Sequence, residues 1–193
     1  MALSTDPGPK LYRYSDLATF PDDNLRREII DGELIVTAAP ATRHQRAVGN
    51  VFFHLEAYCR RSGGQVFPAP TDVYLDDFNV VEPDVLWVAS EHIEQVEEKF
   101  VRGRPDVVVE VSSPSTRRLE LVRKRELYAR FGVPEYWYVD LEVDRVEIYR
   151  LEAGAFGAPS LKTLGEILES PLLPGFSMPV AEALGYEPDR EAE

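Results

Sequence analysis

The sequence predicts a protein of the α/β (α+β) class, in which a mixed β-sheet is flanked by helices. Three observations lead to this prediction. Residues 107–111, V-V-V-E-V, form an apolar run of strand length, which is typical of a strand covered on both faces. Residues 42–61 carry apolar side chains at helical spacing, and residues 143–151 alternate as a half-exposed strand does. Helices and strands that follow one another in this way indicate a sheet covered by helices.

Length and composition indicate a single domain over residues 1–193. Hydrophobic residues make up 44% of the chain and charged residues 28%, the ordinary balance of a protein with a packed core. No apolar run is long enough to cross a bilayer, so we expect no membrane partner. The first residues lack the pattern of a secretory signal, and Cys59 is the only cysteine, which excludes an internal disulfide. We therefore expect a cytoplasmic protein.

The charge of the chain is strongly negative but unevenly distributed. A formal net charge of −13 argues against a simple nucleic-acid binder, because phosphate contacts require clustered lysine and arginine. Residues 117–130 are nevertheless rich in basic side chains, and a second basic patch contains Arg43, His44 and Arg46. These stretches are either a local basic face or solvated helix surfaces with salt bridges, and charge alone does not separate the two.

The first half of the chain predicts a hairpin and then a long helix. Asp31 and Gly32 separate two apolar runs, and this dipeptide favours a two-residue hairpin turn. Glu33 follows the turn and should face solvent, with a role in a site as the minor alternative. The helix over residues 42–61 places His44 on its buried stripe, in the first turn. A histidine there is more often structural than catalytic, although helix N-termini do bind anions.

The remaining elements alternate between strands and helices. Residues 65–75 contain two prolines, which restrict an extended segment to an edge or irregular strand. We then expect a strand, a short acidic helix, the most hydrophobic strand, a long basic helix and two strands of a hairpin, over residues 80–89, 90–99, 104–112, 116–131, 135–140 and 143–151.

Two carboxylates stand in apolar company. Asp84 precedes V-L-W-V, and strand alternation would place it on one face with Leu86 and Val88. Glu110 lies within V-V-V-E-V. An ionised carboxylate among apolar side chains is costly unless it is paired or binds a metal. The alternative for Asp84, which follows Pro83, is a partly solvated strand end, whereas a position in mid-strand makes Glu110 harder to explain in that way.

Lys124 adds a cation on the following helix. The helical stripe that should face the sheet consists of Arg117, Leu121, Lys124, Tyr128 and Phe131. A lysine in this stripe points inward, although its stem can also cover apolar surface while the ammonium reaches solvent. A purely structural ion pair with Glu110 is a further alternative.

Two acids and an inward lysine on consecutive elements are typical of metal-assisted phosphodiester hydrolysis. In this hypothesis Asp84 and Glu110 bind Mg²⁺ (or Mn²⁺) through their oxygens, and a backbone carbonyl near Val111 completes the metal shell. The ion polarises a phosphate oxygen and helps to generate hydroxide. Lys124 positions or activates the water and stabilises charge on the phosphorus.

Several stretches of the chain together carry a family resemblance. They are I-I-D-G-E-L-I, R-H-Q-R-A-V-G-N, V-F-P-A-P-T-D-V, E-P-D-V-L, V-V-V-E-V-S-S-P-S-T, K-R-E-L-Y-A-R-F-G-V-P-E-Y-W-Y-V-D and L-P-G-F. In this combination, over about residues 12–180, the chain resembles the Uma-type restriction endonuclease family of the PD-(D/E)XK nuclease superfamily.

The resemblance implies a restriction-endonuclease-like core in which Asp84 and Glu110 are the acidic motif residues. The superfamily places its lysine two residues after the second acid, where this chain has Ser112. In the Uma-type pattern the lysine lies on the next helix, and Lys124 matches that place. Where that pattern usually has Asp before the lysine, the chain has Glu120. The residues implied at the rim of the site are His44, Gln45 and Glu33.

We therefore expect a magnesium-dependent endonuclease that hydrolyses DNA. A catalytically inactive binding or regulatory module with the same fold is the main alternative, and the net charge of −13 favours it. A hydrolase of small phosphorylated substrates and a nuclease acting on RNA remain open. Because cleavage of both strands often needs two active sites, we expect a homodimer, with the hairpin at 143–150 and the edge near Pro68 as candidate surfaces.

Overall fold

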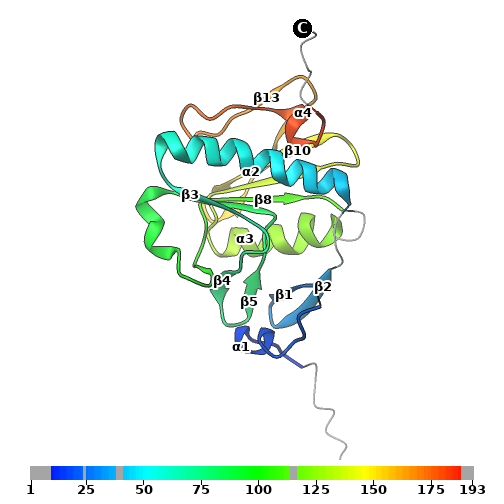
Figure 1. The fold of residues 1–193 in the computed structure, drawn as a ribbon, viewed down its shortest axis with the longest axis vertical. Helices are drawn as coiled ribbons and strands as arrows, with labels where there is room; N and C mark the ends of the chain where they lie inside the picture. The colour runs from blue at the N-terminus through cyan, green and yellow to red at the C-terminus, as the bar shows by residue number, and fades with distance from the viewer. Residues whose placement is uncertain (1–9, 24, 38–40, 114–116, 188–193) are drawn as a thin grey trace, which may run out of the picture.

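The computed structural model describes residues 10–23, 25–37, 41–113 and 117–187. Within these ranges the strands form a seven-stranded sheet, a five-stranded sheet and a two-stranded pair (Figure 1). Helices cover the larger sheet, so the architecture is the mixed sheet flanked by helices that the sequence predicts. None of the described helices is long and apolar enough to cross a bilayer.

The seven-stranded sheet has the order β11-β10-β9-β8-β6-β3, with β12 also paired to β10. Its strands β8 and β9 are parallel and the other pairs are antiparallel. The strands are β3 (Gln65–Pro68), β6 (Val85–Val88), β8 (Val107–Val111), β9 (Glu135–Asp140), β10 (Arg145–Glu152), β11 (Ala155–Phe156) and β12 (Ser160–Thr163). As predicted, the proline-containing segment supplies an edge strand, β3. The hairpin strand β10 is not an open edge, because β9 and β12 flank it.

Helices α2 (Thr42–Ser62) and α3 (Arg125–Arg130) lie on opposite sides of this sheet (Figure 1). Strand alternation explains what each helix meets. Val107, Val109 and Val111 pack in the same cluster as the apolar residues of α2. Val108 instead packs with the residues of α3. Because Glu110 shares the face of Val108, the strand directs its carboxylate toward α3.

The five-stranded sheet has the order β2-β1-β5-β4-β7. The predicted hairpin is confirmed: Asp31 and Gly32 connect its strands with φ values of 53° and 76°. Strand β1 also pairs with β5, where Ile29 lies opposite Val80. The chain leaves β5 directly toward Asp84, so this pairing brings the hairpin to the candidate site. The strands are β1 (Arg26–Ile30), β2 (Glu33–Thr37), β4 (Val73–Asp76), β5 (Asn79–Val81) and β7 (Val101–Arg102).

The prediction of a single strand over residues 80–89 is wrong. The structure divides this stretch into β5 and β6, which belong to different sheets. Asp84 lies in the connection between them and not on a strand, although it is buried to 3% exposure. Pro83 explains the interruption, because proline donates no hydrogen bond to a sheet. The acidic helix predicted over residues 90–99 is only a 3₁₀ helix, η1 (Ser90–Gln95).

The basic helix is continuous but changes its winding. A π-helical stretch, η2 (Leu119–Lys124), runs directly into α3. The start predicted at Thr116 lies outside the described residues. Lys124 and Tyr128 of the predicted stripe are buried, and Glu120 joins them. The remaining short elements are α1 (Tyr14–Leu17), β13 (Ile167–Leu168), β14 (Met178–Pro179) and α4 (Val180–Ala183).

Candidate active site

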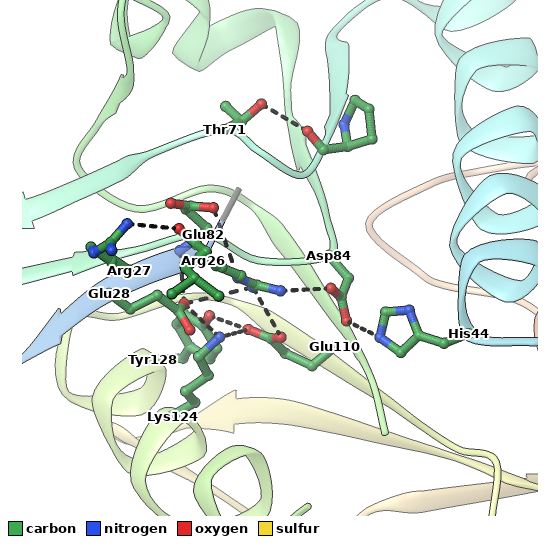
Figure 2. A network of polar contacts seen from close by, with 12 residues as sticks. Arg26, Arg27, Glu28, His44, Thr71, Glu82, Asp84, Glu110, Lys124 and Tyr128 are labelled. Atoms are coloured by element: carbon green, nitrogen blue, oxygen red, sulfur yellow. Dashed lines mark hydrogen bonds and ion pairs between the residues drawn. The ribbon is translucent and has the colours of Figure 1, made fainter. Parts of the chain in front are cut away.

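A buried cluster of charged side chains lies where the two sheets meet η2 (Figure 2). Each of four segments contributes to it. Strand β1 and the segment after β5 supply one side, β8 supplies the base, and η2 supplies a lysine. The members are Arg26, Glu28, Glu82, Asp84, Glu110 and Lys124, with His44 and Tyr128 at its ends.

Glu110 and Lys124, which the sequence analysis selects independently, form an ion pair. The Glu110 Oε1 oxygen accepts hydrogen bonds from the Lys124 ammonium at 2.8 Å and from the Tyr128 hydroxyl at 2.6 Å. Both charged side chains are only 1% exposed. Burial raises the pKa of Glu110, and the nearby positive charge of Lys124 opposes this rise.

Glu28 is a second partner of Lys124. Its Oε1 lies 2.7 Å from the lysine Nζ and accepts the backbone N–H of Glu82 at 2.8 Å. Burial would raise the pKa of Glu28, but Arg26 and Lys124 outweigh it and lower the pKa. The two carboxylates likewise raise the pKa of Lys124 against the effect of burial. The lysine is therefore held as a cation between two acids.

Asp84 connects the cluster to strand β8 and to helix α2. Its Oδ2 accepts the backbone N–H of Val111 at 2.8 Å and lies 3.2 Å from the His44 Nε2 on α2. Its Oδ1 accepts a hydrogen bond from Arg26 at 2.9 Å. Burial alone would raise the pKa of Asp84, but the contacts with His44, Arg26 and Val111 lower it to about 2. Asp84 is consequently ionised at neutral pH.

A cleft of about 1020 Å³ opens beside this cluster. Arg26, His44 and Asp84 line it, whereas Glu110 and Lys124 lie behind them, outside the lining. Glu82 also lines the cleft, and burial raises its pKa to about 7. Substrate entering the cleft would therefore meet Asp84 before it met the deeper acid–lysine pair.

The donor chemistry fits a hard divalent ion, although the cluster is not a preformed metal cage. Among the described residues, no three His, Cys, Asp or Glu side chains converge closely enough to hold a metal. Mg²⁺, however, usually binds through one or two carboxylates and keeps its waters. Asp84 and Glu110 supply two carboxylates, and the buried Oε2 of Glu110 has no hydrogen-bond partner within the described chain. Such an orphaned oxygen is a suitable ligand.

The residues predicted for the rim are divided by the structure. His44 and Gln45 line the cleft, and so does Ser112, a further candidate site residue. The Ser112 hydroxyl accepts the backbone N–H of Leu141 at 2.8 Å. Glu33, by contrast, is exposed on β2, where it pairs with Arg123 at 2.9 Å, and it does not belong to the cleft lining.

Sequence reasoning missed Arg26, Glu28 and Glu82. The apolar runs around Asp31 and Gly32 predict a hairpin, in which charged side chains ordinarily face solvent. A signal for their burial was nevertheless present. Side chains alternate along a strand, so Arg26 and Glu28 share a face with Ile30, which is buried. Pairing of β1 with β5, which the sequence does not specify, then brings them to Asp84.

A solved structure shares this fold. The crystal structure of "a putative nuclease belonging to DUF820 from Anabaena variabilis ATCC 29413" matches with a TM-score of 0.73 and 14% sequence identity, over 88% of this chain and 96% of that chain. No curated protein matches the chain. The likeness shows that the chain has the fold of that structure, a mixed sheet flanked by helices.

The family follows from the sequence itself. Residues 12–181 match the Uma2 family model, described as "Putative restriction endonuclease". Because the match covers most of the chain, the protein belongs to the Uma2 family. The predicted Uma-type family and the restriction-endonuclease-like fold class are both confirmed.

Proposed function

We propose that the protein is a Mg²⁺- or Mn²⁺-dependent endonuclease that hydrolyses DNA phosphodiester bonds. The observation that carries this proposal is the convergence of Asp84, Glu110 and Lys124 beside a cleft. Membership of a family described as restriction endonucleases supports nucleic acid as the substrate.

In this proposal Asp84 and Glu110 hold the divalent ion, with the backbone carbonyl of Val111 as a further ligand. When bound, the ion supplies a Lewis acid that polarises the phosphate and lowers the pKa of the attacking water. Val111 and His44 fix Oδ2 of Asp84, and Oδ1, which pairs with Arg26, is the oxygen proposed to bind the ion. Lys124 orients Glu110 and opposes the rise of its pKa, and its positive charge adds to the stabilisation of the negatively charged transition state.

Calorimetric titration of Mn²⁺ into wild type and Glu110→Gln tests the metal site. We expect saturable binding by wild type and at least about a tenfold loss of affinity in the variant, because a neutral amide replaces a charged ligand. Glu33→Gln is the matched control, since it removes an exposed carboxylate outside the cleft. Plasmid cleavage in Mg²⁺ by wild type and Asp84→Asn then tests the reaction; cleavage that survives Asp84→Asn would contradict the proposal.

One observation favours the alternative of an inactive binding module. The cluster already contains the cation Arg26, which pairs with Asp84 at 2.9 Å. A folded wild-type protein that binds neither Mg²⁺ nor Mn²⁺ would favour this alternative.

We further propose a cytoplasmic homodimer. The single cysteine is consistent with a reducing compartment, and cleavage of both strands benefits from two active sites. Strand β3 is an edge of the larger sheet and is the candidate surface. Sedimentation equilibrium should give twice the chain mass of 21.8 kDa; a mass that stays monomeric at micromolar concentration would reject the dimer.

A further inference from the structure

The guanidinium of Arg26 lies among four carboxylates (Figure 2). Its nitrogens are 2.9 Å from Asp84, 3.6 Å from Glu28, 3.8 Å from Glu110 and 3.9 Å from Glu82. These acids come from three separate segments of the chain. Arg26 is therefore the positive charge that these four acids share at the side of the cluster that faces the cleft.

The same guanidinium faces the two oxygens that are best suited to bind a divalent ion. Asp84 uses Oδ2 for Val111 and His44, which leaves Oδ1 for Arg26. The other contact, 3.8 Å long, is made by the Glu110 Oε2.

That Glu110 oxygen is free because Oε1 accepts from both Lys124 and Tyr128. Oε2 is buried and has no hydrogen-bond partner among the described residues. A buried carboxylate oxygen without a donor is costly, and a cation that contacts it directly would remove this cost.

Arg26 itself is an imperfect occupant of this position. Its Nε and Nη2 are buried without hydrogen-bond partners in the described chain, although guanidinium presents five donors in all. Its side chain is 23% exposed and lines the cleft, so Arg26 lies between the deeper acids and the cleft.

We propose that Arg26 is a resident cation that occupies the divalent-ion position in the metal-free protein and leaves it when the ion binds. This inference rests on the metal site of the proposed function and adds the residue that regulates access to it. A metal ion and a guanidinium repel each other, so direct binding of the ion to these two oxygens disfavours a guanidinium placed between them. Because Arg26 lines the cleft, displacement moves the guanidinium toward the place where a substrate phosphate would bind.

Competition of this kind weakens the measured affinity for the ion. If the form with Arg26 displaced makes up about 1–10% of the metal-free protein, the apparent dissociation constant is about 10–100 times the intrinsic one. Removal of the guanidinium should abolish that factor. The expectation is unusual, since loss of a residue from the site tightens binding of the ligand.

The test is calorimetric titration of Mn²⁺ into wild type, Arg26→Met and Arg27→Met. We expect Arg26→Met to bind about tenfold more tightly than wild type or better. Arg27→Met is the matched control, because Arg27 also lines the cleft but pairs with Asp23 at 2.6 Å instead of with an acid of the cluster. It removes the same charge and should change the affinity by less than about twofold.

Equal or weaker binding by Arg26→Met would overturn the inference. If wild-type binding is lost in Glu110→Gln but unchanged in Arg26→Met, the metal site stands and only the role of Arg26 falls. If Arg26→Met and wild type are both folded and neither binds, the inference falls together with the proposed metal site. An equal gain of Mn²⁺ affinity in Arg27→Met would mean that removal of any nearby positive charge has this effect. That result would also overturn the inference.

Thermal unfolding supplies a readout that is independent of activity. In EDTA, Arg26→Met should unfold at a lower temperature than wild type, because the buried Asp84 loses its arginine partner. Saturating Mn²⁺ should raise its midpoint by more than that of wild type. Should Arg26→Met fail to fold under all conditions, Arg26→Lys gives the same test, since a single ammonium cannot reproduce the planar array of guanidinium donors; it should bind Mn²⁺ a few-fold more tightly than wild type, and unchanged affinity would reject the inference.

Discussion

Lys124 shows how a buried cation can be structural and functional at once. Its ammonium lies 2.7 Å from Glu28 and 2.8 Å from Glu110, at 1% exposure. We predict that Lys124→Met lowers the free energy of unfolding by about 3–5 kcal/mol at pH 8, because removal of one partner leaves buried carboxylates uncompensated. Urea denaturation measures this loss, with Arg118→Met, at an exposed position of the same helical segment, as the control.

A loss below about 1 kcal/mol would mean that the acids are solvated without the lysine, in contradiction to the burial described here. The prediction also affects how activity data are interpreted. An inactive Lys124 variant identifies a functional residue only if the variant remains folded at the assay temperature.

Glu82 gives the cluster a defined dependence on pH. Burial raises its pKa in the folded protein to about 7, whereas its ordinary value is 4.5. The folded state therefore binds this proton more tightly, and its contribution to stability is present below pH 4.5 and lost as the pH rises toward 7. Glu82→Gln cannot ionise, so its stability relative to wild type should increase by about 2–3 kcal/mol between pH 4.5 and pH 8.

Urea denaturation in EDTA at the two pH values checks this prediction, because the chelator keeps metal from altering the titration. Asp77→Asn, which removes a more exposed carboxylate paired with Arg13, is the control and should show no comparable change. A stability difference between Glu82→Gln and wild type that is the same at both pH values would contradict the raised pKa.

At the scale of the element, the hairpin of β1 and β2 is what delivers Arg26 and Glu28 to the site. Its turn depends on Gly32, which has a φ of 76° and whose added Cβ would lie 2.9 Å from a methyl group of Leu11. We predict that Gly32→Ala lowers the free energy of unfolding by about 1–2 kcal/mol, from backbone strain and crowding together.

Gly49→Ala is the matched control for this substitution. Gly49 lies in the middle of α2, where an added Cβ meets nothing within 4 Å. Alanine should therefore stabilise the protein by up to about 1 kcal/mol, through its higher helix propensity. Thermal or urea denaturation of both variants should give changes of opposite sign; stabilisation by Gly32→Ala would exclude the described turn.

The two faces of β8 illustrate what alternation does at this scale. The odd-numbered valines pack against α2, and the even-numbered side passes from Val108 to Glu110 toward α3. A single shift of register would place the carboxylate against α2, away from Lys124. The parallel pairing of β8 with β9, in which Glu110 lies opposite Tyr138, fixes that register.

For the whole molecule, the arginines that line the cleft determine how it can treat a polyanion. Each is already paired with a carboxylate: Arg26 with Asp84, Arg27 with Asp23, Arg43 with Asp144 and Arg117 with Asp140. The net charge of −13 opposes DNA at longer range. Phosphates would thus meet few uncompensated positive charges in the absence of a divalent ion.

We predict that DNA binding by this protein depends on divalent ions. In EDTA the dissociation constant for a labelled duplex should be at the weak, non-specific level of about 10⁻⁴ M or higher, whereas Ca²⁺ should tighten it at least about tenfold. Fluorescence anisotropy at constant ionic strength measures both values, and Na⁺ at matched ionic strength is the control. Micromolar or tighter binding in EDTA would contradict the prediction and indicate a basic surface elsewhere.

The sequence by itself determined the elements whose signals are local. The hairpin at Asp31 and Gly32, the buried stripe of α2 and the buried strand β8 were all predicted, because turn chemistry and side-chain periodicity are properties of neighbouring residues. The same periodicity placed Lys124 on the helical stripe that faces the sheet, with an ion pair to Glu110 as one alternative, and the structure brings the two side chains to 2.8 Å.

Only the tertiary structure decided which distant segments converge. Pairing of β1 with β5 brings Arg26 and Glu28 to Asp84, and Pro83 turns a predicted single strand into two strands of different sheets. Such pairings depend on hydrogen bonds between segments more than 50 residues apart, which leave no periodic signal in either segment. The sequence therefore revealed Asp84, Glu110 and Lys124, whereas the position of Arg26 among the acids became visible only in the folded chain.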